Sequence, residues 1–276
     1  MKEATPPHGL RSFVGGEEAG ALVDRFDRAL ATLEALDDAD PNLSVKPTPA
    51  WSVGDVFAHL AIESDRYARE LEGSGTWSSS ADAIAETNRR ELDGFEGRDP
   101  QQLVMTIRRN VARYLSSLDE RDLDEIGHGL DAGLRVAFRH GAGVLLGELV
   151  LHGHDLAAAV QRPATIRAED AAFIVDGAWR VLPAFLDMRR ANGFNGAFEV
   201  RLRGYQTLRV RVEDCRATAG AAGARPDAVI SADPVAFLLT MYGRRSQLQA
   251  VLRLHMVAWG WRPHRAFMLR RLFIQP

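Results

Sequence analysis

The feature that most constrains the fold of this chain is a change in hydrophobic period near residue 190. Before that point apolar residues recur every three or four positions, as in the segment of about Gly16–Leu36, which is the spacing of an amphipathic helix. After Asn192, the segments FEVRLRG and TLRVRVED alternate apolar and arginine positions, which is typical of strands exposed on one face. We therefore expect a helical domain over residues 1–190 and an α/β domain over residues 191–276.

Further helices are predicted in the N-terminal part. One starts at Trp51–Ser52, because Ser52 and Asp55 have the spacing of a capping box, and it runs through Tyr67 before GSGTWSSS breaks it. The other expected helices cover residues 81–95, 100–118, 143–160 and 168–190. In the C-terminal part we expect a strand, a helix, a strand-like segment and a helix, in the order AVISA, DPVAFLLTMYG, LRLHMVAWG and PHRAFMLRRLF.

Composition and charge exclude several classes of function. Hydrophobic residues make up 46% of the chain and charged residues 26%, which is typical of a folded globular protein. The net charge is −3 with both signs interspersed, so we expect no nucleic-acid partner and no membrane partner. The N-terminal sequence MKEATPPHGLRSF lacks the apolar core of a signal peptide, and the single cysteine, Cys215, fits a reducing compartment. We therefore expect a cytoplasmic protein.

The helix expected over residues 143–160 carries two polar residues within its apolar stripe. Glu148 and His152 are four positions apart, so their side chains can reach one point beside the helix. A buried carboxylate needs a cation, a proton or a set of donors. A hydrogen bond between Glu148 and His152 would meet that need, and so would a divalent metal. His59, on the apolar side of the helix after Ser52, offers a third ligand.

Three protein ligands leave one coordination position open for water or a substrate atom, as in catalytic zinc sites. Asp155 follows His152 by about one turn, and we expect it to accept a proton from a histidine ring and so fix its tautomer. Glu63, four residues after His59, is predicted to be either a fourth ligand or a base. A fourth protein ligand would close the open position.

The segments WSVGDVFAHL and GELVLHGHDLAAAV resemble the mycothiol-dependent maleylpyruvate isomerase family, a branch of the DinB-like metal-binding bundles. This resemblance implies an N-terminal up-and-down four-helix bundle and a smaller C-terminal sterol-carrier-like α/β domain. In such proteins the histidine of the first motif and the glutamate and histidine of the second bind a divalent metal, usually zinc. The matching residues here are His59, Glu148 and His152.

The resemblance also implies mycothiol as a cofactor or co-substrate. A thiol that coordinates a metal becomes a thiolate at neutral pH, so the protein itself needs no catalytic cysteine, and we expect Cys215 to be structural. The thiolate could be transferred to a small electrophile, which we favour, or could add and leave again in a cis–trans isomerisation. Arg89 and Arg90 are candidates for holding a substrate carboxylate, the alternative being a solvated helix face.

Two other classes of function stay open at this point. In a non-catalytic binding protein, the metal would stabilise the helical domain and the C-terminal domain would hold an apolar small molecule. Such a protein predicts a metal with no open coordination position, whereas an open or water-bound position favours the enzyme. A metal-assisted hydrolase would activate water instead, and it would depend on the metal alone because the chain has no G-x-S-x-G segment.

Overall fold

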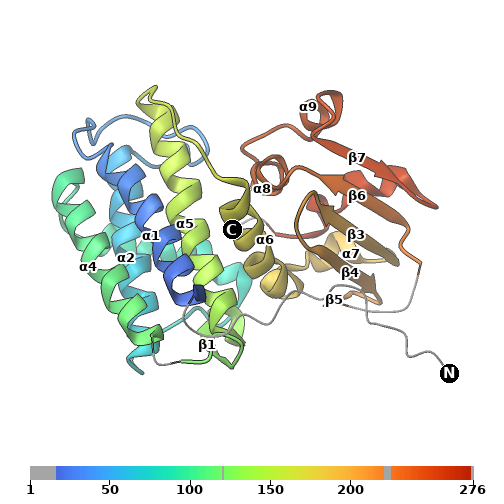
Figure 1. Ribbon diagram of the computed structural model, residues 1–276, viewed down its shortest axis with the longest axis horizontal. Coiled ribbons are helices and arrows are strands. Elements are labelled where there is room, and N and C mark those ends of the chain that lie inside the picture. The colour runs from blue at the N-terminus through green and yellow to red at the C-terminus, as the bar shows by residue number, and fades with distance from the viewer. Residues whose placement is uncertain (1–16, 120, 221–224, 275–276) are drawn as a thin grey trace.

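The computed structural model describes residues 17–119, 121–220 and 225–274. The N-terminal part is mainly helical, and the C-terminal part contains a mixed β-sheet (Figure 1). The sequence MKEATPPHGLRSF and the expected helix start at Gly16 lie outside the described residues. The α-helices are α1 (Glu17–Glu34), α2 (Val53–Leu71), α3 (Ile84–Gly94), α4 (Pro100–Leu118), α5 (Phe138–Ala159), α6 (Ala168–Val181), α7 (Met188–Ala191), α8 (Pro234–Met241) and α9 (Gln247–Leu252).

The long helices α1, α2, α4 and α5 pack side by side. Helix α2 contacts both α4 and α5, and α1 contacts the same two helices from the other side (Figure 1). Their apolar stripes meet in a core that includes the fully buried Phe26, Phe57, Ile107 and Leu149. Helices α2 and α5 are therefore direct neighbours, which is the arrangement that a site shared between His59 and the α5 residues requires.

The start of α2 is fixed by the predicted capping box. The Ser52 side chain accepts a hydrogen bond from the Asp55 backbone N–H, and the Asp55 carboxylate accepts one from the Ser52 N–H. Arg98 adds a third contact, because its Nε donates to Asp55 at 2.6 Å. Caps of this kind stabilise a helix by about 1 kcal/mol, and this one sets where α2 begins and so where His59 lies.

Helix α5 begins at Phe138, five residues before the predicted start. A short hairpin, β1 (Ile126–Leu130) and β2 (Leu134–Ala137), precedes it, and the sequence pattern did not indicate this hairpin. Helix α6 crosses α5 closely where Gly143 faces Gly177. A Cβ atom on Gly177 would lie 2.7 Å from the backbone oxygen of His140, so this contact between the helices requires glycine.

The prediction of one helix over residues 168–190 is wrong. Helix α6 ends at Val181, and the 3-10 helix η3 (Leu182–Phe185) follows it. Pro183 lies in η3 and has no N–H to continue the helix. Leu186 then forms an isolated antiparallel bridge with Phe273, so the connection between the two parts of the chain is held by the C-terminal segment.

The sheet of the C-terminal part has the strand order β5-β4-β3-β6-β7. Strands β3 and β6 are parallel, with Phe198 opposite Ala228, and the other neighbours are antiparallel. Helix α8 packs against α6, where the rings of Trp179 and Phe237 lie 6.3 Å apart, and a continuous cluster of buried hydrophobic residues runs through both parts. The strands are β3 (Gly196–Leu202), β4 (Thr207–Glu213), β5 (Arg216–Ala219), β6 (Ala228–Ala232) and β7 (Met256–Trp259).

The end of the chain departs from the predicted pattern. The segment LRLHMVAWG forms a strand only over β7, and α9, which was not predicted, ends at Leu252 just before it. The expected helix PHRAFMLRRLF is instead the two 3-10 helices η4 (Pro263–Met268) and η5 (Arg270–Leu272). Among the described residues, no helix combines the length and the apolar character needed to cross a bilayer.

Candidate metal centre

Three side chains from two helices converge between α2 and α5. His59 comes from α2, and Glu148 and His152 come from consecutive turns of α5. One ligand atom from each residue lies within 4.8 Å of the ligand atoms of the other two. The three residues that the sequence pattern singled out as ligands are thus brought together, and we refer to them as the His–Glu–His cluster.

The separations within this cluster fit a metal better than they fit hydrogen bonds. Glu148 Oε2 lies 3.4 Å from Nε2 of His59 and 3.4 Å from Nε2 of His152. A charged N–H···O bond is usually about 2.7–2.9 Å long. Two ligand atoms bound at about 2.0–2.1 Å to one tetrahedral zinc lie roughly 3.3–3.4 Å apart. The two imidazoles and the carboxylate therefore have the chemistry of a divalent-metal site, both nitrogen–oxygen separations match one, and the two histidine ligand atoms lie within 4.8 Å of each other.

Burial and charge act against each other at Glu148. Burial by itself would raise the pKa of the carboxyl group, but the hydrogen-bonding and charge contributions of His152 and His59 lower it well below its ordinary value. Glu148 is therefore ionised at neutral pH, which is the form in which a carboxylate binds a metal. The two histidines are nearly buried, whereas 31% of the Glu148 side chain is exposed, so the cluster faces solvent on the glutamate side.

Trp51 covers the histidine side of the cluster. Its ring lies 4.9 Å from the His59 ring and 6.2 Å from the His152 ring, measured between centroids. Trp51 immediately precedes the capping residue Ser52, so the cap that starts α2 also positions this aromatic ring. The contact restricts the orientation of both imidazoles and excludes water from that side.

Asp155 lies beside the cluster, but its main partner comes from the C-terminal part. Its carboxylate accepts hydrogen bonds from Arg244, from Nη2 at 2.6 Å and from Nε at 3.1 Å and 3.2 Å. The distance from Asp155 Oδ2 to His152 Nδ1 is 3.7 Å, which exceeds a hydrogen bond. The predicted proton acceptance from His152 stays a prediction, and the structure shows a two-pronged ion pair with Arg244 instead.

Arg244 is the residue near the site that sequence reasoning missed. It follows α8, and its Nη1 donates to the backbone oxygen of Tyr242 at 2.9 Å. Burial raises the pKa of the Tyr242 hydroxyl, and the charge of Glu148 adds to this increase, which places Tyr242 within the electrostatic reach of the cluster. The only signal in the sequence was the arginine pair in MYGRRS, and nothing in its spacing points to Asp155, 89 residues earlier.

Glu63 lies one turn after His59 but is bound to a different partner. Its carboxylate accepts a hydrogen bond from Arg66 at 2.7 Å, and Arg66 also pairs with Glu91. Glu63 is buried, and this burial raises its pKa to about 7 despite the positive charges of Arg66 and His59. Glu63 is not one of the three clustered ligands, and its raised pKa is a property expected of a base that works near neutral pH.

The other predicted site residues lie on the surface or in turns. Arg89 is exposed on α3, where it pairs with Glu86 and Asp93 of the same helix, and Arg90 donates to Thr87. The structure does not bring these two arginines to the His–Glu–His cluster, and their surroundings are those of a solvated helix face. Cys215 lies in the turn between β4 and β5.

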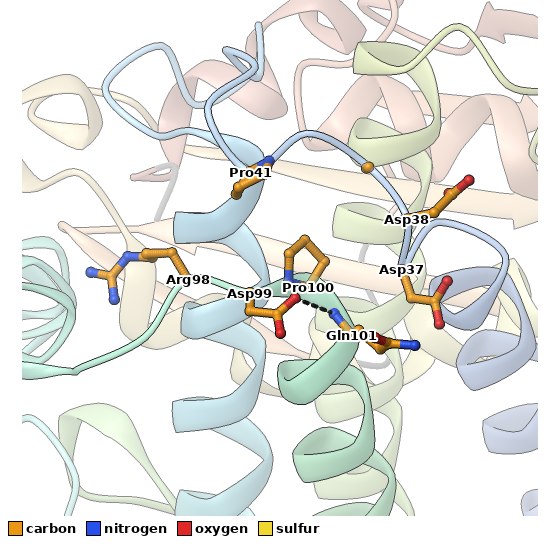
Figure 2. A pocket seen from close by; sticks show the side chains of 8 residues that line it. Asp37, Asp38, Pro41, Arg98, Asp99, Pro100 and Gln101 are labelled. Carbon is orange, nitrogen blue, oxygen red and sulfur yellow. Dashed lines mark hydrogen bonds between the residues drawn. The ribbon is translucent and has the colours of Figure 1, made fainter.

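Two surface pockets occur in the helical part, and neither includes the cluster. One has a volume of about 500 Å³ and is lined by Asp37, Asp38 and Asp99, among others. Figure 2 shows Asp99 bonded to the Gln101 backbone N–H, where it caps α4, while Arg98 points away from the aspartates. The other pocket, of about 410 Å³, is lined by Arg66 among others. The acidic side chains of the first pocket are thus partly engaged in capping and pairing.

The fold and the cluster together define a class: a helical part that carries a candidate metal site, joined to a smaller α/β part. The family model described as "Mycothiol maleylpyruvate isomerase N-terminal domain" matches residues 22–157. This segment contains all three clustered residues, so the part of the chain that carries the cluster is similar to that family. None of the curated proteins matches the chain.

Two solved structures are similar to the whole chain. The crystal structure of a histidine-to-alanine variant of mycothiol-dependent maleylpyruvate isomerase is 13% identical, with a TM-score of 0.55 over 89% of this chain and 93% of that one. The crystal structure of the mycothiol-dependent maleylpyruvate isomerase is 14% identical, with a TM-score of 0.49 over 86% of this chain and 92% of that one. At this identity the first match shows that both parts of the fold are shared.

Proposed function

We propose that this protein is a divalent-metal enzyme that uses mycothiol to act on a small electrophile. The observation that supports the proposal most directly is the His–Glu–His cluster, in which the two nitrogen–oxygen separations of 3.4 Å equal the edge of a tetrahedral zinc site. The match of residues 22–157 to the mycothiol maleylpyruvate isomerase family model supports the choice of thiol. The three ligands leave a coordination position for that thiol.

The residues around the cluster would have separate roles in this reaction. His59, Glu148 and His152 would hold the metal, which when bound supplies the positive charge that lets a thiol lose its proton at neutral pH. Glu63, with its pKa of about 7, is the carboxyl group we propose as the base that takes up that proton. Asp155 holds Arg244 in place at the edge of the site.

A substrate carboxylate would need a guanidinium close to the cluster. We propose Arg244 for this role in preference to Arg89 and Arg90, because Arg244 binds Asp155 of the ligand-bearing helix while Arg89 pairs with acids of its own helix. The planar fork of arginine suits a carboxylate. Such a group would orient an unsaturated acid for thiolate addition.

Cis–trans isomerisation and S-transfer share their first step and differ in the second. In both, the thiolate sulfur forms a bond to an electrophilic carbon. In isomerisation, the carbon–sulfur bond breaks again after rotation, and the thiol is regenerated. In S-transfer, the sulfur stays attached to the product. The match to the family model favours isomerisation, and the chemistry of the cluster serves either outcome.

The metal is tested by elemental analysis of untagged protein. We expect about one divalent ion, zinc, per wild-type chain and its loss in His152→Ala. His140→Ala is the matched control, because His140 is also on α5 but pairs with Asp176. Wild-type protein that neither carries a metal nor takes one up would refute the metal centre.

The thiol is tested by titrating mycothiol into the metal-loaded protein while following proton release. We expect binding with release of a proton, followed by isomerisation of a cis-unsaturated keto acid or by formation of a thioether conjugate, which mass spectrometry distinguishes. A metal-loaded protein that neither binds the thiol nor releases a proton would point to the binding-protein or hydrolase function. Release of product with water incorporated would identify the hydrolase.

The finer description of the fold is part of the same proposal. We propose that α1, α2, α4 and α5 form a DinB-like up-and-down four-helix bundle and that the sheet part is sterol-carrier-like, with residues 1–190 and 191–276 as the two domains. The packing of α2 on α4 and α5 and the start of β3 at Gly196 support this division. We also propose that the protein acts in the cytoplasm.

A further inference from the structure

The C-terminal segment has a charge opposite to that of the rest of the chain. Residues 234–276 contain seven arginines and neither aspartate nor glutamate. The other 233 residues hold 27 basic and 37 acidic residues, so they carry −10 against +7 in this segment. The net charge of −3 therefore hides an asymmetry along the chain. Arg244, Arg262 and Arg265 pair with Asp155 or Asp227 outside the segment, and the remaining arginines can face an anionic partner.

The same segment also exposes an unusual number of large apolar side chains. Of the thirteen exposed large hydrophobic residues in the described parts of the chain, seven lie between residues 248 and 267, with exposed fractions of 41–73%. We call the surface they form the α9–β7 face. Its members are Leu248, Leu252, Leu254, Val257, Trp259, Trp261 and Phe267.

These side chains lie on adjoining elements at the outer edge of the sheet. Helix α9 packs against β7, and η4 packs against both β6 and β7. Figure 1 shows α9 and β7 at the upper edge of the C-terminal part, above β6. Strand β7 is the last strand of its sheet, so no further strand of that sheet covers it. A partner could therefore reach this face without approaching the His–Glu–His cluster.

The backbone holds one of these apolar residues outward at a cost. Leu254, between α9 and β7, has φ of +56°, a conformation that is unfavourable for a side chain with a Cβ. Its side chain is nevertheless 69% exposed, so burial of the leucine does not compensate for the strain. This conformation ends α9, because the N–H groups of Leu254 and His255 donate to the backbone oxygens of Val251 and Ala250, and it leaves the leucine side chain presented to solvent.

Exposed arginines lie next to the apolar side chains of the α9–β7 face. Arg253 lies between two exposed leucines, and Arg262 follows Trp261, with its guanidinium 3.6 Å from the Asp227 carboxylate. Two copies of this face would bring like charges together, which disfavours self-association. The face is therefore complementary to a surface that is both anionic and apolar.

We propose that the α9–β7 face is a docking surface for an anionic phospholipid bilayer, on which the protein rests without crossing it. Leucine and tryptophan side chains that protrude among arginines match the interface of such a bilayer, where the apolar groups enter the acyl boundary and the guanidinium groups meet lipid phosphates. A peptide partner would more commonly be received by a groove, whereas the apolar side chains of this face are themselves 41–73% exposed. The expectation of no membrane partner rested on the charge of the whole chain, which differs from that of this face.

The test is co-sedimentation of the full chain with phosphatidylcholine vesicles that either contain or lack phosphatidylglycerol. We expect wild-type protein to pellet only with the anionic vesicles and to be released by salt. Leu252→Ser combined with Trp261→Ser should abolish pelleting. Arg253→Gln should weaken it by about fivefold, the effect of one arginine near a charged surface.

The matched control carries the same chemical change on the helical part. Met105 and Ile126 are 63% and 69% exposed, so Met105→Ser with Ile126→Ser should leave vesicle binding at the wild-type level. The proposal is overturned if the wild-type protein stays in the supernatant with anionic vesicles, or if the α9–β7 variants bind as well as the control. A dimer in light scattering that only Leu252→Ser with Trp261→Ser dissociates, without vesicle binding, would assign the face to a second copy instead.

Discussion

Removing the Arg244 side chain should destabilise the protein far more than removing an arginine from its surface. Asp155 is 1% exposed and Arg244 is 13% exposed, measured on their side chains. Arg244→Met would leave the Asp155 carboxylate buried without its cation. The variant retains an apolar chain of similar length, so the change removes the charge and the hydrogen bonds more than it removes packing.

The size of the effect follows from burial. Breaking a buried ion pair by removing one partner costs about 3–5 kcal/mol. At about 2.1 cal/mol/K of unfolding entropy per residue, this cost lowers the melting temperature of a chain of this length by roughly 5–9 °C. Asp155→Asn should also destabilise the protein, because Arg244 then loses its counter-ion. The double variant should be more stable than the sum of the two effects predicts, with a coupling free energy of about 1–3 kcal/mol.

The assay is a double-mutant cycle measured by urea unfolding of the wild type, Arg244→Met, Asp155→Asn and the double variant. The exposed ion pair between Asp38 and Arg162 provides the control cycle, in which we expect no measurable coupling. Additive effects at Asp155 and Arg244 would refute the reasoning, because they would mean that the contact between the two parts of the chain does not form in solution.

Three further outcomes are expected from the structure. In metal-free protein, the free energy of unfolding should fall as pH rises from about 4.5 to 7. Folding raises the pKa of Glu63 to about 7, so in this range the folded state binds more protons than the unfolded state. Unfolding measured as a function of pH should lose this slope in Glu63→Gln. Gly177→Ala should destabilise the protein by about 1–3 kcal/mol, because the new Cβ would clash with a backbone oxygen. Gly20→Ala, with open space around it on α1, should be neutral or slightly stabilising, as measured by thermal unfolding. Ser52→Ala should cost about 1 kcal/mol through loss of the α2 cap, measured by urea unfolding.

The elements that the sequence predicted well are those whose pattern is local. The start of α2 was predictable because Ser52 and Asp55 carry the signal within four residues, and Pro100–Leu118 was confirmed residue for residue as α4. The elements that were missed depend on distant contacts. The bridge between Leu186 and Phe273 connects residues 87 positions apart, and it helps to turn the expected long helix into α6, η3 and α7.

The same distinction applies to the candidate site. Glu148 and His152 are four residues apart on one helix, so their convergence follows from helical geometry alone. His59 could be suggested as a partner because it lies on an apolar helix face, but its approach to α5 depends on how α2 packs. Arg244 gave no usable signal, because an arginine in a loop is usually solvated and its partner, Asp155, was already expected to serve His152.

The position of Arg244 also bears on what the C-terminal part does. Arg244 binds Asp155, three residues after the ligand His152, and α9 begins at Gln247, three residues after Arg244. The short segment between α8 and α9 therefore joins the edge of the His–Glu–His cluster to the α9–β7 face. A part of the chain that supplies a buried counter-charge beside the cluster is not an independent ligand-binding module attached to it. We infer that the C-terminal part completes the site through Arg244, on the side that faces the helical part. It presents the basic, apolar α9–β7 face on its other side.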